Sequence, residues 1–134
     1  MGNEMTPCCG PSGDTEGSGG LVVCEIQAGA CGFCTRVEAR GHDRFRASFA
    51  IETPCEKVAA FAGELATNGP VDVLAEIDPS GQSTVLGAAR ATLSGCCAAC
   101  AVPVGVFKAM QVAVGFAPSH DVVIHIDSSG GNGA

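Results

Sequence analysis

Residues 35–51, TRVEARGHDRFRASFAI, decide the fold, because apolar and polar side chains alternate on both sides of a predicted turn. The alternation runs through residues 35–40, and Gly41-His42-Asp43 supplies the turn. In the returning half the apolar side chains fall on every second residue, at Phe45, Ala47, Phe49 and Ile51. A period of two is typical of a strand with one buried face. The segment therefore predicts an antiparallel β-hairpin.

The flanking segments predict one more strand before the hairpin and helices after it. Residues 21–26, LVVCEI, are rich in β-branched side chains and predict a strand. Thr53-Pro54-Cys55-Glu56 carries three signals of a helix start: Thr at the N-cap, Pro at the first helical position, and a Glu that closes a capping box. We expect further helices from Pro70, over residues 83–93, and from Pro103 to about Gly115. A final strand is predicted at residues 121–126, DVVIHI.

The resulting order, β-β-β-α-α-α-α-β, indicates an α+β fold, in which helices cover one face of an antiparallel three- to four-stranded sheet. The chain has 134 residues, which suits one domain. We expect residues 1–20, with Cys8-Cys9, to form a flexible arm, because they hold few apolar side chains. Residues 21–127 then form a single cysteine-rich domain, and residues 128–134 form a flexible tail.

The composition excludes several classes of function and indicates a cellular compartment. The net charge of −7 argues against a nucleic-acid partner, and no Ser-His-Asp spacing, phosphate loop or dinucleotide fingerprint is present. Residues 1–5 contain no basic residue and lead into no apolar run, so we expect no secretory signal. Residues 98–117 are apolar enough to span a membrane, but we interpret them as a buried core helix and expect no membrane partner. These features predict a cytoplasmic protein with reduced thiols.

Nine cysteines make thiol chemistry the leading interpretation. Cys31 and Cys34 form a C-x-x-C motif that a strand follows, whereas redox dithiols of the thioredoxin type precede a helix. A pair of metal or cluster ligands on a loop is therefore favoured over a redox pair. Cys55 lies at the predicted start of a helix, where free N–H groups and the helix dipole favour a thiolate. The alternative for Cys55 is a small buried apolar side chain.

Cys96, Cys97 and Cys100 lie just before the helix predicted at Pro103, and Cys97 and Cys100 form a second C-x-x-C motif. Two such motifs can supply thiolates for zinc, another soft metal ion or an iron–sulfur cluster. Cys24, inside the first strand, is expected in the core. Cys8 and Cys9 could capture a soft metal or be idle. Three histidines are assigned to solvent or to the core: His42, His120 and His125.

Three runs resemble a family of small uncharacterised cysteine-rich proteins from anaerobic bacteria and archaea: residues 28–33 (AGACGF), 101–109 (AVPVGVFKA) and 121–124 (DVVI). A more distant similarity exists to the iron–sulfur cluster assembly scaffold of the IscU and NifU N-terminal type. It consists of Cys31-Gly32, a hairpin, and then Cys55 at a helix start. That resemblance implies a nascent cluster held on three cysteines with the help of an aspartate, whose place Phe33 takes in this chain.

The sequence therefore predicts a binding module that holds an iron–sulfur cluster or a soft metal ion, as a scaffold or carrier. The candidate ligands are Cys31, Cys34, Cys55, Cys96, Cys97 and Cys100, and the expected partner is a protein that donates or accepts metal or sulfur. The competing hypothesis is a thiol-based sulfur carrier or oxidoreductase, with Cys55 or Cys100 as its nucleophile. A third possibility is structural, with small cysteines scattered through the core. If the binding module exists, Cys31, Cys55 and at least one of the three later cysteines should lie close together.

Overall fold

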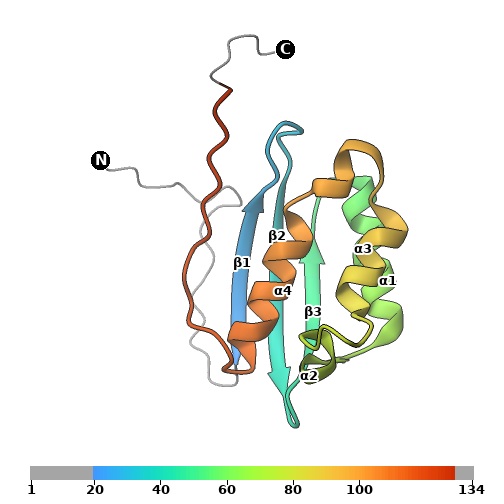
Figure 1. The fold of residues 1–134 in the computed structure, drawn as a ribbon, viewed down its shortest axis with the longest axis vertical. Coiled ribbons are helices and arrows are strands. Elements are labelled where there is room, and N and C mark those ends of the chain that lie inside the picture. Colours follow the sequence, from blue (N-terminus) through green and yellow to red (C-terminus); the bar gives the residue numbers. More distant parts are fainter. Residues whose placement is uncertain (1–19, 129–134) are drawn as a thin grey trace.

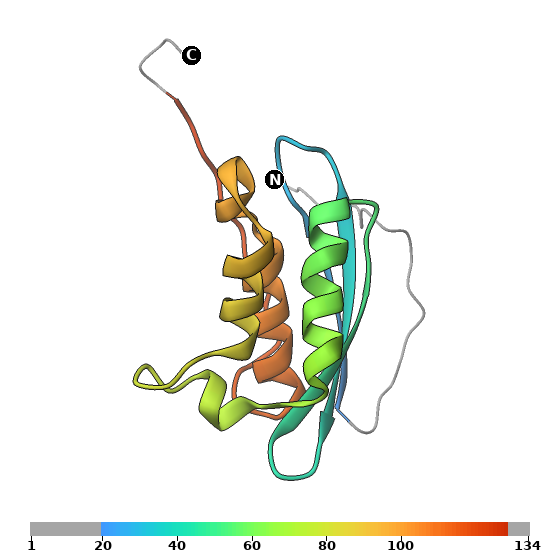
Figure 2. The same cartoon turned by 90° about the vertical axis from the view of Figure 1, so that its right-hand side faces the viewer.

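The computed structural model describes residues 20–128 and shows an α+β fold, as the sequence predicts. Four antiparallel strands form one sheet in the order β1-β2-β3-β4. The strands are β1 Leu21–Gln27, β2 Cys34–His42, β3 Arg46–Glu52 and β4 Val71–Asp72. The helices are α1 Glu56–Asn68, α2 Val73–Glu76, α3 Thr84–Thr92, the 3₁₀ helix η1 Gly95–Ala99 and α4 Val102–Ala113. They cover one face of the sheet (Figures 1 and 2).

The predicted hairpin is present, with its turn two residues later than the sequence suggests. Ala39 pairs with Phe49 and Gly41 pairs with Ala47, so Gly41 and His42 belong to β2. The turn occupies residues 43–45, where Arg44 and Phe45 adopt positive φ angles of 63° and 55°. Phe45 is therefore not on the buried face of β3. It is 45% exposed, and its ring lies 5.0 Å from that of Phe116.

Helix α4 packs on β1 and β2 at very short range. A Cβ atom built on Gly105 of α4 would lie 2.6 Å from Ile26 Cδ1 and 3.2 Å from Cys24 Sγ. At the other end of the helix, a Cβ on Gly41 would lie 2.5 Å from the Ala113 carbonyl oxygen. Glycine is therefore required on both sides of this helix–sheet contact, because a side chain would push the layers apart.

The core between the two layers contains residues from the sheet and from α1, α3 and α4. Its largest fully buried side chains include Phe61 of α1 and Met110 of α4. Helix α1 packs on β3 and on α3, so the helical layer is continuous across the sheet. One segment, Gly95–Ala113, is long and apolar enough to span a membrane by length and composition, which is weak evidence because core helices meet the same test. Half of the residues of α4 are buried inside the fold, and 28% of the apolar segment as a whole is buried.

Two other sequence predictions differ from the structure. Val71 and Asp72 form the short strand β4 beside β3, so the helix expected from Pro70 begins only at Val73. Residues 121–126 do not form a strand, because no neighbouring strand of the described chain pairs with them. A strand needs a hydrogen-bonded neighbour in addition to β-branched side chains. The predicted arm and tail lie largely outside the described residues, in 1–19 and 129–134.

The close contact at Gly105 gives a stability prediction. Gly105→Ala should lower the free energy of unfolding, because the overlap of its methyl group with Ile26 costs about 1–3 kcal/mol and outweighs a helix-propensity gain of roughly 0.5–1 kcal/mol. Urea denaturation followed by circular dichroism measures the change. Gly63→Ala in α1 is the matched control, since nothing lies within 4 Å of its Cβ position. That variant should gain roughly 0.5–1 kcal/mol from helix propensity. Equal effects of the two substitutions would contradict the packing described here.

Candidate functional site

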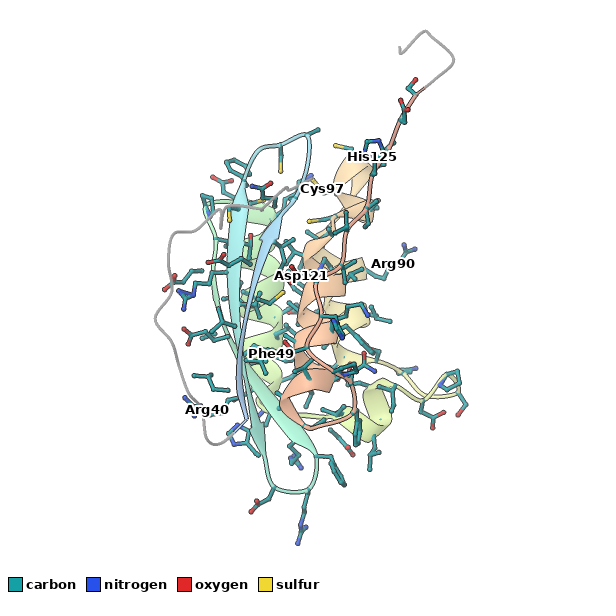
Figure 3. The ribbon with its side chains drawn as sticks, turned by 90° about the vertical axis from the view of Figure 1, so that its left-hand side faces the viewer. Arg40, Phe49, Arg90, Cys97, Asp121 and His125 are labelled. Atoms are coloured by element: carbon teal, nitrogen blue, oxygen red, sulfur yellow. The ribbon has the colours of Figure 1, made fainter. Side chains whose placement is uncertain are left out.

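Three segments that carry cysteines meet at one end of the molecule. β1 ends there and continues into the β1–β2 loop with Cys31, and β3 ends there and leads to Cys55 at the start of α1 (Figure 1). The same end holds η1 and the start of α4, with Cys96, Cys97 and Cys100 (Figure 2). Figure 3 labels Cys97 at this end. We call this region, with Cys31, Cys55, Cys97 and Cys100, the thiol end.

Cys31 is presented by a tight loop between β1 and β2. The Ala28 N–H donates to the Phe33 carbonyl over 3.1 Å, and the Gly32 N–H donates to the Gly29 carbonyl over 2.9 Å. Gly29 and Gly32 have φ angles of 102° and 77°, which glycine adopts without strain. Cys31 is an exposed free thiol at the tip of this loop.

Cys34 is the first residue of β2 and pairs with Gln27 across the sheet. It is disulfide-bonded, so its sulfur is not available as a ligand in this state. The two cysteines of the first C-x-x-C motif therefore do not form a pair of free thiols here. A ligand role for Cys34 stays a prediction for the reduced protein.

Cys55 is the N-cap residue of α1, two positions earlier relative to the helix than the sequence suggests. The helix begins at Glu56, and Thr53, which we expected at the N-cap, precedes it by three residues. The Thr53 hydroxyl accepts a hydrogen bond from the Cys55 N–H over 3.2 Å. The same hydroxyl lies 2.8 Å from that of Thr35, which is buried on β2. This contact ties the start of α1 to the sheet and fixes the backbone at Cys55.

The three cysteines in and after η1 differ in their exposure to solvent. Cys96 is exposed, whereas Cys97 and Cys100 are half-buried and pack against the core, as Cys55 does. The Cys100 N–H donates to the Cys97 carbonyl over 3.0 Å, which closes the turn between them. Cys97 and Cys100 are therefore the members of this group that pack against the main hydrophobic core.

The pKa of Cys100 is influenced by cysteines of the other segments at the thiol end. Burial raises the pKa of Cys100, and a hydrogen bond from the Val102 N–H, at the start of α4, opposes that effect. Charge repulsion from Cys31, Cys55 and Cys97 raises the pKa further. Such repulsion requires these sulfur atoms to lie within electrostatic range of Cys100. The structure thus brings together cysteines from all three segments. Cys96 does not contribute to this repulsion.

The sulfur atoms are not arranged for a metal ion as they stand. Within residues 20–128, no three His, Cys, Asp or Glu side chains are positioned to hold one. Zinc needs sulfur atoms about 2.3 Å from the ion, so ligand sulfurs must approach within roughly 4 Å of one another. The donor set is nevertheless suited to soft ions, because thiolates select zinc, copper(I) and iron–sulfur clusters.

Of the remaining candidates, Cys24 and His42 lie away from the thiol end, whereas Figure 3 shows His125 at the same end as Cys97. Cys24 of β1 contacts α4, and burial raises its pKa, with further contributions from the nearby carboxylates of Asp121 and Glu25. His42 lies in the hairpin, where its Nε2 atom is 2.8 Å from the Ser48 hydroxyl. His120 and His125 are exposed. Cys8 and Cys9 lie outside the described residues.

One buried carboxylate was missed by the sequence analysis. Glu76 at the end of α2 is only 5% exposed and accepts hydrogen bonds from the Ser83 hydroxyl and from the N–H groups of Thr84 and Val85. The carboxylate of Glu76 therefore caps the N-terminus of α3, and both of its oxygen atoms accept hydrogen bonds there. The sequence signal was weak, because the partners lie seven to nine residues further along the chain.

The fold and the thiol end define a small α+β domain with a group of free cysteines at one end of its sheet. The chain belongs to DUF6951, a family of unknown function, whose family model matches residues 22–126. This is consistent with the resemblance to an uncharacterised family. Comparisons with curated proteins and with solved structures found no match.

The shifted pKa of Cys24 predicts how stability depends on pH. A thiol whose pKa is higher in the folded protein stabilises the fold while it is protonated. That contribution is lost as the pH rises above the ordinary thiol pKa, about 8.5, and through the higher value of the folded state. We expect the free energy of unfolding to fall between pH 8 and about pH 10, and to fall less in Cys24→Ala. Urea denaturation with a reductant at both pH values measures this, and an identical slope in the two proteins would contradict it.

Proposed function

We propose that the thiol end binds a soft metal ion or an iron–sulfur cluster, and that the protein acts as a scaffold or carrier for it in the cytoplasm. Cys31, Cys55, Cys97 and Cys100 would be the ligands, with Cys96 and reduced Cys34 as further candidates. The observation that carries this proposal is the convergence of three separate segments, which brings Cys31, Cys55 and Cys97 within electrostatic range of Cys100. A group of thiols scattered through the core would show no such relation.

The four candidate ligands differ in burial, which leaves the site accessible to solvent at Cys31. Cys55, Cys97 and Cys100 pack against the core, while Cys31 is exposed on a loop. Cys31 can therefore move toward the other three without disturbing the core, because loop residues have fewer packed contacts. A site with one exposed ligand suits a protein that receives and releases its cargo. Its partner would be a protein that donates or accepts metal or sulfur.

The raised pKa of Cys100 favours this proposal over a nucleophilic role for that residue. A nucleophilic cysteine needs thiolate character near neutral pH, which burial opposes at Cys100. A bound cation has the opposite effect, because it removes the repulsion among the thiolates and displaces the proton. Proton release on metal binding is therefore expected, and affinity should rise with pH. An oxidoreductase or sulfur carrier that uses Cys55 remains the alternative outcome of the experiment below.

Replacement of single cysteines tests the proposed site. Cys55→Ser should weaken Cd²⁺ binding by about ten- to a hundredfold, because one thiolate ligand is lost. Titration of the reduced full chain under anaerobic conditions, followed by the cadmium–thiolate absorption band in the ultraviolet, measures the affinity. Cys24→Ser is the matched control, since this half-buried thiol lies on β1 against α4, and its affinity should stay within about twofold of the native value.

The same variants separate the hypotheses. Anaerobic incubation of the reduced chain with ferric iron, a thiol reductant and sulfide should give the visible absorption of a cluster in the native protein and in Cys24→Ser, but not in Cys55→Ser. If Cys55→Ser and Cys24→Ser bind cadmium and iron equally well, the proposed site is wrong. If neither metal binds and Cys55 alone reacts rapidly with alkylating agents, the thiol-based enzyme is favoured.

A further inference from the structure

The C-terminal segment of the described chain is extended and apolar, yet it has no strand beside it. Residues 121–126, DVVIHI, leave Val123, Ile124 and Ile126 exposed by 76%, 68% and 87%. Within residues 20–128, no backbone–backbone hydrogen bond involves residues 117–128. A run of β-branched side chains with free N–H and C=O groups has strong potential to pair with another strand.

The sheet of the same chain offers an open edge of matching length. β1, Leu21–Gln27, pairs with β2 on one side and has no strand of the described chain on the other. It carries a single charged side chain, Glu25, and contains no proline. Protected edges usually contain lysine, proline or a bulge. At about 3.3 Å per residue, six residues of the C-terminal segment span almost the length of β1.

The side-chain pattern of the segment also fits this edge. Val122, Ile124 and Ile126 alternate with Asp121, Val123 and His125. In β1, Val22 and Cys24 pack on the helix-covered face of the sheet, in a cluster with residues of α4. Pairing in a suitable register would place the apolar side chains at 122, 124 and 126 on that same face, since strands alternate with a period of two.

Within one chain the segment runs beside β1 without joining it. Figure 1 shows it running from the end of α4 in the same direction as β1, and Figure 3 shows Asp121 beside β1 and α4. Asp121 lies near enough to Cys24 to repel its thiolate, which places the segment at the seam between β1 and α4. Pairing in this direction would be parallel, which is slightly less stable per residue than antiparallel pairing. A second copy can approach in the antiparallel direction.

We propose that residues 121–126 of one copy pair with the β1 edge of a second copy, and that the exchange is reciprocal. The product is a twofold-symmetric dimer in which each sheet gains one strand. Such an interface is self-complementary, as twofold symmetry requires, because each copy supplies one open edge and one unpaired segment. The dimer interface is formed by β1 and residues 121–126 and does not depend on metal binding at the thiol end.

Sedimentation velocity of the reduced full chain tests this proposal. We expect a mass of twice 13.3 kDa at micromolar concentration for the native protein. Ile124→Lys should shift the mass to that of the monomer, because an added strand would bury a charge on the apolar face. Ser119→Lys is the matched control, since it adds the same charge at an exposed position outside the segment and should leave the dimer intact. Circular dichroism confirms that each variant is folded.

Hydrogen exchange then locates the interface. In the native dimer the outward-facing amides of β1 should exchange slowly, and in Ile124→Lys they should exchange at least tenfold faster. Three results would overturn the proposal: a native protein that is monomeric at every concentration, an Ile124→Lys variant that stays dimeric, or a dimer whose β1 amides exchange equally fast in both proteins. The last two results would indicate a different surface, including direct pairing of β1 with β1.

Discussion

The close approach of α4 to the sheet is the contact on which the rest of the structure depends. Gly105 brings the helix backbone against Ile26 and Cys24 of β1, and Gly41 of β2 lies against the carbonyl of Ala113. These two contacts lie at separate points along α4, so they fix both its distance from the sheet and the orientation of its axis. Because α4 begins at Val102, two residues after Cys100, this packing also fixes the position of η1 relative to the β1–β2 loop. The thiol end is thus a consequence of helix–sheet packing.

The thiol end combines features that favour a bound cation. Partial burial disfavours a thiolate at Cys100, the neighbouring cysteines repel it, and the Val102 N–H stabilises it. Together these effects raise the pKa of Cys100, with burial as the largest cause. A soft cation stabilises the thiolate, because its positive charge compensates the repulsion among the sulfur atoms. The effect is strong because the site is partly desolvated. Cys31 is exposed on its loop, so a metal ion or a donor protein can reach it from solvent. The same charge compensation applies to any soft metal ion.

The sequence predicted the elements that depend on local periodicity. It did not predict features that depend on contacts with residues far away in the chain. The hairpin, β1, α1, α3 and α4 followed from alternation and helix-start signals, and the convergence of cysteines was expected because two helix starts and one loop share a sheet end. The turn at Phe45 was missed, since positive φ angles at Arg44 and Phe45 have no local signal without glycine. Residues 121–126 have strand propensity, but propensity does not supply a neighbouring strand. The half-burial of Cys97 beside the exposed Cys96 follows from η1 and could not be predicted from spacing.

Alkylation of the individual cysteines in the presence of zinc shows whether the three segments share one metal site. The reduced full chain is treated with iodoacetamide in the presence and absence of Zn²⁺, and peptide mass spectrometry gives the modification rate at each cysteine. The account predicts that Zn²⁺ slows alkylation of Cys31, Cys55, Cys97 and Cys100 together, at the same metal concentration, and leaves Cys24 unchanged. Protection that is absent, or that falls on cysteines from only one of the three segments, would contradict a shared site at the thiol end.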